Sequence, residues 1–125
     1  MVAAAWVALG VLGLLALFQV ALIAGAPLGR FAWGGQHRVL PTGLRFGSVV
    51  SILIYAVFAV FLLSKAGLWD LVANETVLHV GLWVMSAYLV LGVLMNAVSR
   101  SKPERNLMTP TALVLAVCVL VVTLA

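Results

Sequence analysis

The chain has 125 residues, of which 66% are hydrophobic and only 8% are charged, with a formal net charge of +4. Soluble domains are roughly 45–50% apolar and about 25% charged, so this composition excludes a soluble globular domain and indicates an integral membrane protein. The seven Lys and Arg residues lie at the ends of apolar segments and form no basic stripe. We therefore expect no nucleic-acid partner, and expect these cations to contact the anionic headgroups of a lipid bilayer.

Four segments are long and apolar enough to cross a membrane, since a spanning helix needs about 20 apolar residues. The expected spans are residues 2–24, 44–64, 77–98 and 109–125. The first span has no basic region before it, which argues against a cleaved signal peptide. The sequence thus predicts an all-α fold, a polytopic transmembrane four-helix bundle that forms one domain over residues 1–125.

Residues at the ends of the spans indicate where helices begin and end. Gly67 follows the second span and predicts a glycine-type helix end. Asn74 or Thr76 is the expected N-cap of the third helix. Thr109 and Pro110 are expected to be the N-cap and first residue of the fourth helix. Because this fourth span is the shortest, its helix could also begin before Thr109, or lie in a locally thinned bilayer.

The distribution of cations between the two ends of the bundle predicts how the chain threads the membrane. The first and third connections, with the residues that flank them, lie on one side, and the other side contains only Lys65. The cations of the first group are Arg30, Arg38, Arg45, Arg100, Lys102 and Arg105. Because cytoplasmic loops are enriched in Lys and Arg, we expect loops 1 and 3 in the cytoplasm and both termini outside. The expected location is the bacterial cytoplasmic (inner) membrane.

The first connection, residues 25–41, is the least regular part of the chain and reads GAPLGRFAWGGQHRVLP. Phe31 and Trp33 lie between cations, as in segments that rest at headgroup depth. Gly34 and Gly35 permit a tight turn with positive φ. The segment is expected either to be interfacial or to dip between the helix ends as a re-entrant lid, which requires protein or water to satisfy its backbone.

Polar residues within the spans concentrate in the half next to this first connection. Helical spacing places Ser51 and Tyr55 on one face of the second span, and Tyr88 and Asn96 on one face of the third. Such stripes are typical of packing seams between helices in lipid. The alternative is a polar vestibule that faces the cytoplasm and is roofed by the first loop. The candidate ligand-binding residues are Gln19, Arg30, Trp33, Gln36, His37, Arg45, Ser48, Ser51, Asn96 and Arg100.

The polar and charged residues of the chain do not indicate a catalytic site or an ion-coupled carrier. No Asp or Glu lies within an expected span, whereas ion-coupled carriers typically place an ionisable group there. His37 would need a carboxylate or nucleophile within reach to act in catalysis. The acid on its side, Glu104, is expected to pair with Arg105 or Lys102. We expect no catalytic residue, no metal site and no cofactor.

The motifs of the first loop are similar to those of a family of small bacterial four-span membrane proteins. The resemblance runs through FQVALIAGAPLGRFAWGGQHRVLP, LRFGSVVS and LGVLMNAVSRSKPER, and into the last span. The chain departs from the family at Leu28 and Arg30, where an aromatic residue and an acid are expected. The resemblance implies a four-span membrane fold and no particular activity.

Three hypotheses for function follow. The first is a small interaction or lipid-contacting membrane component without catalytic chemistry, with a membrane protein or a second copy of the chain as a possible partner. The second is a permease or channel that uses the vestibule as an oligomer. The third is a membrane enzyme that uses His37.

Overall fold

A computed structural model describes all 125 residues and contains four long helices and no strand. Two single turns of 3-10 helix, η1 (Gly29–Phe31) and η2 (Trp33–Gly35), lie in the first connection. The long helices are α1 (Val2–Ile23), α2 (Thr42–Lys65), α3 (Glu75–Ala97) and α4 (Lys102–Leu124). Each is long and apolar enough to cross a membrane. The protein is therefore a multi-pass integral membrane protein built as a four-helix bundle, as the sequence predicts.

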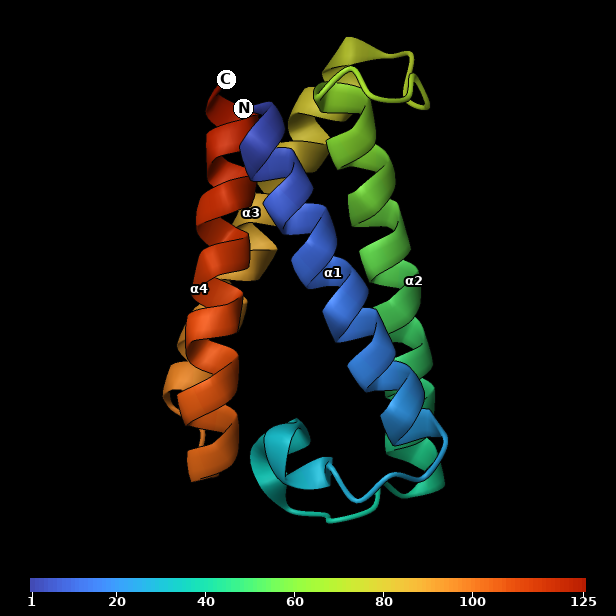
Figure 1. The fold of residues 1–125 in the computed structure, drawn as a ribbon, viewed down its shortest axis with the longest axis vertical. Coiled ribbons are helices and arrows are strands. Elements are labelled where there is room, and N and C mark those ends of the chain that lie inside the picture. The colour runs from blue at the N-terminus through green and yellow to red at the C-terminus, as the bar shows by residue number, and fades with distance from the viewer.

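The bundle is wedge-shaped because α1 and α4 meet at one end and separate toward the other. Both chain termini lie at the end where these helices meet, and the connection between α1 and α2 crosses the end where they are apart (Figure 1). Ala5 and Ala8 of α1 are fully buried, and Ala116 of α4 is 3% exposed. Small side chains let helix backbones approach closely in lipid. The alanines therefore account for the narrow end of the wedge.

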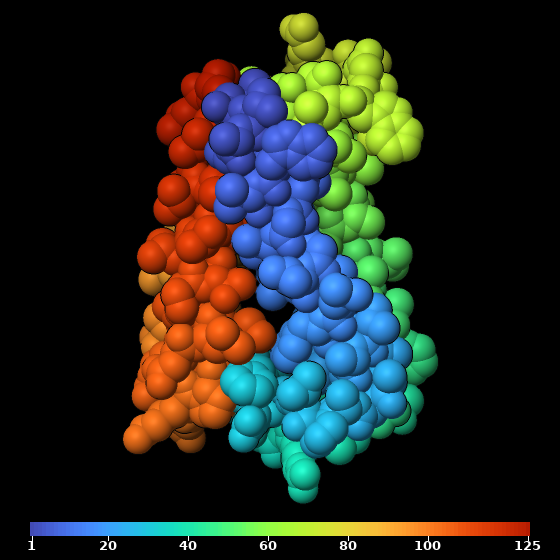
Figure 2. Space-filling view, in the orientation of Figure 1, coloured from blue at the N-terminus to red at the C-terminus, as the bar shows by residue number.

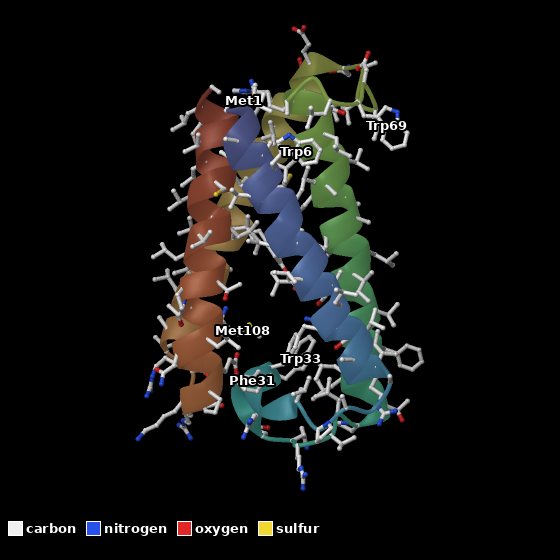
Figure 3. All side chains as sticks on the ribbon, viewed as in Figure 1. Met1, Trp6, Phe31, Trp33, Trp69 and Met108 are labelled. Carbon is white, nitrogen blue, oxygen red and sulfur yellow. The ribbon has the colours of Figure 1, made fainter.

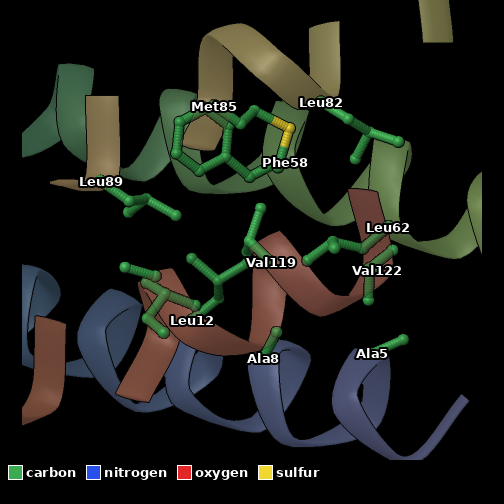
Figure 4. Packing of buried hydrophobic residues seen from close by; sticks show 12 residues of the cluster. Ala5, Ala8, Leu12, Phe58, Leu62, Leu82, Met85, Leu89, Val119 and Val122 are labelled. Carbon is green, nitrogen blue, oxygen red and sulfur yellow. The ribbon is translucent and has the colours of Figure 1, made fainter. Parts of the chain in front are cut away.

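The hydrophobic core fills the half of the bundle next to the termini. Leu62, Val119 and Val122 are completely buried within it, and side chains from all four helices interdigitate there (Figure 4). Its twelve members are Ala5, Ala8, Leu12, Phe58, Leu62, Leu82, Met85, Leu89, Leu115, Ala116, Val119 and Val122. The Ser86 and Thr123 hydroxyls, 3.2 Å apart, join α3 to α4 at the same end. This end of the bundle is therefore closely packed.

The start of α4 differs from the expected position. Ser101 is the N-cap, its Oγ accepts from Glu104 N at 3.5 Å, and the helix continues through Thr109 with Pro110 inside it. The interpretation of Thr109 and Pro110 as a helix start is therefore wrong, and the alternative of an earlier start is correct. The Ser101 to Glu104 spacing is an S-x-x-E capping signal that outweighs the missing donor of the proline.

The other predicted helix ends agree with the structure. Asn74 Oδ1 accepts a hydrogen bond from Val77 N at 3.1 Å and caps α3. Gly67 follows the end of α2 with φ +72°, as expected for a glycine-type end. The six predicted loop cations lie at the end opposite the termini, where basic side chains project around the helix ends (Figure 3).

Candidate functional site

The connection between α1 and α2, residues 24–41, here called loop 1, is folded back on itself. Gly29 N donates to Arg38 O at 2.9 Å, which closes the loop. Gly29 is buried, and a Cβ atom at this position would overlap the backbone of His37 and Arg38. Only glycine fits where two stretches of backbone approach this closely. Loop 1 is therefore a compact element of its own.

Loop 1 is docked onto α4 and fastened to α1 and α2. The Ser101 hydroxyl donates to the Arg30 carbonyl, so the N-cap of α4 also holds the loop. On the other side, Arg45 Nε donates to Leu40 O at 2.8 Å, and Arg45 Nη1 reaches Ile23 O at 3.4 Å. A guanidinium at the end of α1 also complements the negative pole of that helix. Arg45 thus fixes the two ends of the loop rather than facing a ligand.

Trp33 is aimed into the bundle by an uncommon backbone conformation. Its φ is +52°, and Gly34 and Gly35 follow at +76° and +70°. A non-glycine residue with positive φ costs free energy, and such residues concentrate at functional sites. The indole lies against Gly47 of α2, where a Cβ atom would come within 2.8 Å of the ring. Figure 3 shows Phe31 and Trp33 rising from loop 1 into the space between the helices, with Met108 of α4 across from them.

Next to Phe31 and Trp33 lies a cavity of about 220 Å³, lined by residues of all four helices and loop 1. The space-filling view shows the surface hollowed between α1 and α4 directly beside loop 1 (Figure 2). The lining comprises Leu15, Phe18, Gln19, Phe31, Ala32, Trp33, Ser51, Tyr55, Tyr88, Leu89, Gly92, Asn96, Glu104, Met108, Thr111, Ala112 and Leu115. We call this space the loop 1 cavity. It adjoins the hydrophobic core, and Leu89 and Leu115 belong to both.

Aromatic rings make up much of the wall. They come from α1, loop 1, α2 and α3, namely Phe18, Phe31, Trp33, Tyr55 and Tyr88. Tyr88 is fixed by an edge-to-face contact with Phe58 of the core, with ring centroids 5.6 Å apart. Aromatic walls with a few polar groups are typical of small-molecule sites. The cavity is thus suited to a mainly apolar molecule.

Several polar groups of the wall have already donated their hydrogen bonds. Ser51 Oγ donates to Gly47 O at 3.1 Å, Asn96 Nδ2 to Gly92 O at 2.9 Å, and Thr111 Oγ1 to Leu107 O at 2.7 Å. Gln19 differs, because its side chain is 8% exposed and its Oε1 has no partner. A buried amide oxygen without a donor is costly and is uncommon in native structures. Gln19 Oε1 is therefore the polar atom of the wall most in need of a partner.

Glu104 was expected to pair with Arg105 or Lys102, and this expectation is wrong. The carboxylate is 8% exposed, lines the cavity and accepts a hydrogen bond from Ser99 Oγ at 3.1 Å. Arg105 instead reaches the backbone oxygen of Ser99 at 3.4 Å. Because α4 begins at Lys102, Glu104 belongs to its first turn and faces inward. The expected spans contain no Asp or Glu, but the helices extend beyond those spans, so that Glu104 lies in the first turn of α4 and Glu75 in the first turn of α3.

The predicted candidates divide into three groups. Those that the structure brings together at the cavity are Gln19, Trp33, Ser51 and Asn96. Ser48 is fully buried with no hydrogen-bond partner, and Arg45 fastens loop 1, so neither lines the cavity. The exposed candidates outside the cavity are Arg30, Gln36, His37 and Arg100. Of these, Arg30 lies over the Phe31 ring at 4.9 Å.

Further wall residues were not among the candidates. Tyr55 and Tyr88 were placed on helix faces interpreted as packing seams. In the structure the part of each face near Tyr55 or Tyr88 lines the cavity. Met85 packs in the core near the termini, whereas Tyr88 and Asn96, farther along the same helix, line the cavity. The signal that could have found them is the position of each residue along the span, combined with its face.

Comparison with known proteins gives no assignment, since no family model, curated protein or solved structure matches the chain. The resemblance to small bacterial four-span proteins therefore stays a prediction. Function is argued from the cavity itself.

Proposed function

We propose that this protein is a non-catalytic membrane component that binds one small, mainly apolar molecule in the loop 1 cavity. The observation that carries the proposal is the cavity itself, about 220 Å³ in volume, with five aromatic rings and a few polar side chains in its wall. An apolar cavity of about 150 Å³ holds benzene. One of about 220 Å³ has room for a substituted ring or a short branched chain.

The route of entry supports a lipid-contacting role. The hollow opens between α1 and α4, on the side of the bundle where the bilayer would lie (Figure 2). A molecule dissolved in the membrane could therefore enter without crossing the hydrophobic core. His37 is exposed and lies outside the cavity, so this geometry lends no support to the enzyme hypothesis.

The second candidate function is a permease, and the convergence of Gln19, Ser51 and Asn96 on one cavity favours it. In this conformation the twelve-residue core fills the bundle between the cavity and the end with the termini. Passage across the membrane would therefore require the helices to move or a second copy to complete the path. A binding component needs neither, and for this reason it is the first proposal.

The cation distribution supports a proposed orientation in a bacterial cytoplasmic membrane. Six of the seven cations lie at the loop 1 end, and positive charge favours the cytoplasmic side. The cavity would then open toward the inner leaflet. A reporter enzyme that is active only in the cytoplasm should be inactive when fused after Ala125 and active when inserted after Gln36. The reverse pattern would contradict this orientation.

Filling the cavity should abolish binding without unfolding the protein. Ala112 lines the cavity, and phenylalanine at this position would occupy much of its volume. Titrating tert-butylbenzene into the protein in lipid nanodiscs should shift the NMR signal of the Trp33 indole N–H, and Ala112→Phe should remove that response. Ala56→Phe, on the exposed face of α2, is the matched control and should respond as the unaltered chain does. If Ala112→Phe binds as well as the control, the cavity is not the site.

A further inference from the structure

Hydroxyl and amide oxygens in the wall of the loop 1 cavity can accept hydrogen bonds from a ligand. Ser51, Asn96 and Thr111 each donate to a carbonyl of their own helix, so their oxygens remain as acceptors. Amide, hydroxyl and carboxylate oxygens pair with donors or with positive charge. A hydrogen-bond donor or a positive charge on a bound molecule could therefore pair with these oxygens.

The charge of the wall is negative. Glu104 is its one charged residue, and none of the six cations at this end of the bundle lines the cavity. Ser99 is the one side chain that hydrogen-bonds to its carboxylate. Burying a carboxylate costs free energy unless a charge or hydrogen bonds compensate it. The N-terminal turn of α4 offsets part of this cost, because the positive end of the helix dipole lies there. The remaining cost would be relieved by a cation in the cavity.

The aromatic rings of the wall favour the same charge. The face of an aromatic ring carries negative electrostatic potential and attracts ammonium groups, most strongly where water is excluded. Five rings line this cavity, and they come from four different segments of the chain. A set of rings around one space, together with a carboxylate, suits an organic ammonium group better than a neutral or anionic one.

We infer that the loop 1 cavity binds a small lipophilic organic cation, with the charged group between Glu104 and the aromatic rings. The inference rests on the proposed function and adds the charge of the ligand to it.

The test compares two probes of the same shape that differ in charge. Phenyltrimethylammonium is a cation, and tert-butylbenzene replaces its nitrogen with carbon. Each is titrated into the full chain in lipid nanodiscs, and the Trp33 indole N–H signal reports binding. We expect the cation to bind roughly tenfold more tightly than its neutral counterpart, once the partitioning of both probes into the lipid is subtracted.

Variants of Glu104 and Phe18 test whether these side chains cause the tighter binding of the cation. Glu104→Gln keeps the shape of the side chain and an oxygen for Ser99, and should remove most of the preference. Glu75→Gln, at the exposed start of α3 at the opposite end, is the matched control and should retain it. Phe18→Leu keeps the wall apolar but removes one ring, and should reduce binding of the cation more than binding of the neutral probe.

The outcomes separate the two proposals. If both probes bind equally, the cavity is a binding site but the cation inference is overturned. If neither probe binds, the proposed function fails as well. If both Glu104→Gln and Phe18→Leu still bind the cation more tightly than the neutral probe, by the same factor as the unaltered chain, the cation inference is also overturned.

Discussion

Replacing Gly29 with alanine should open loop 1 and weaken binding in the cavity roughly tenfold or more. The added Cβ would overlap the carbonyl oxygens of His37 and Arg38, which belong to backbone and cannot rotate away as a side chain could. The hydrogen bond from Gly29 N to Arg38 O would break, and the loop would no longer hold Phe31 and Trp33 over the cavity. Aromatic contacts contribute about 1 kcal/mol each, so losing two of them exceeds the roughly 1.4 kcal/mol that corresponds to a tenfold loss of affinity.

Hydrogen exchange measured by mass spectrometry checks this prediction directly. Amides of residues 24–41 should exchange faster in Gly29→Ala, while those of the four helices keep their protection. Gly43→Ala is the control, because nothing lies within 4 Å of a Cβ at that position. Unchanged exchange in loop 1, with unchanged probe binding, would show that the loop does not depend on this close approach.

Replacing Ala8 with phenylalanine should destabilise the bundle by about 1–3 kcal/mol, the usual cost of overpacking a close-packed interior. Ala8 has no exposed surface and lies in the core where α1 approaches α4. A large side chain there would separate the two helices at the end where they meet. Ala3→Phe on the exposed face of α1 is the matched control and should have little effect, because its ring would lie in lipid.

Unfolding in mixed micelles of increasing sodium dodecyl sulfate content measures the difference between the two variants. The midpoint should fall for Ala8→Phe and stay close to that of the unaltered chain for Ala3→Phe. Equal midpoints for the two variants would mean that the terminal end of the bundle is not packed as closely as the structure indicates.

Much of the fold follows from the sequence because the bilayer leaves few alternatives. Backbone polar groups must be satisfied within each span, so four apolar segments of sufficient length become four helices. The helix boundaries at Gly67 and Asn74 follow from residue types with specific roles at helix ends. The start of α4 could not be placed by composition alone, because Pro110 and Ser101 both resemble helix starts. Tertiary contact through Ser101 to loop 1 favours the earlier one.

The candidate site was predicted in outline and misjudged in detail. The polar residues Gln19, Ser51 and Asn96 belong to the alternative interpretation, a vestibule beneath the first loop, and they line one cavity there. The sequence does not distinguish the loop cations that bind backbone from those that are exposed. Arg45 donates a hydrogen bond to Leu40 O, whereas Arg100 is exposed. Glu104 was not predicted as a wall residue, because α4 was expected to begin after it.

The role of Glu104 depends on where α4 begins. With the helix starting at Thr109, this glutamate would lie in a charged turn beside basic neighbours. With the helix starting at Lys102, it occupies the first turn and faces the interior. A shift of a helix boundary by two turns thus moves an acid from the surface to the wall of the cavity. Sequence patterns place boundaries less securely than they place spans.

The location of a bound molecule tests the central claim most directly. The nine equivalent methyl protons of phenyltrimethylammonium or tert-butylbenzene give one intense NMR signal, suited to nuclear Overhauser measurements against the labelled protein in nanodiscs. The account predicts cross-peaks from at least one probe to Trp33, Tyr55 and Gln19, which line the cavity. Cross-peaks confined to the exposed Trp6 and Trp83, or none to the protein, would contradict it.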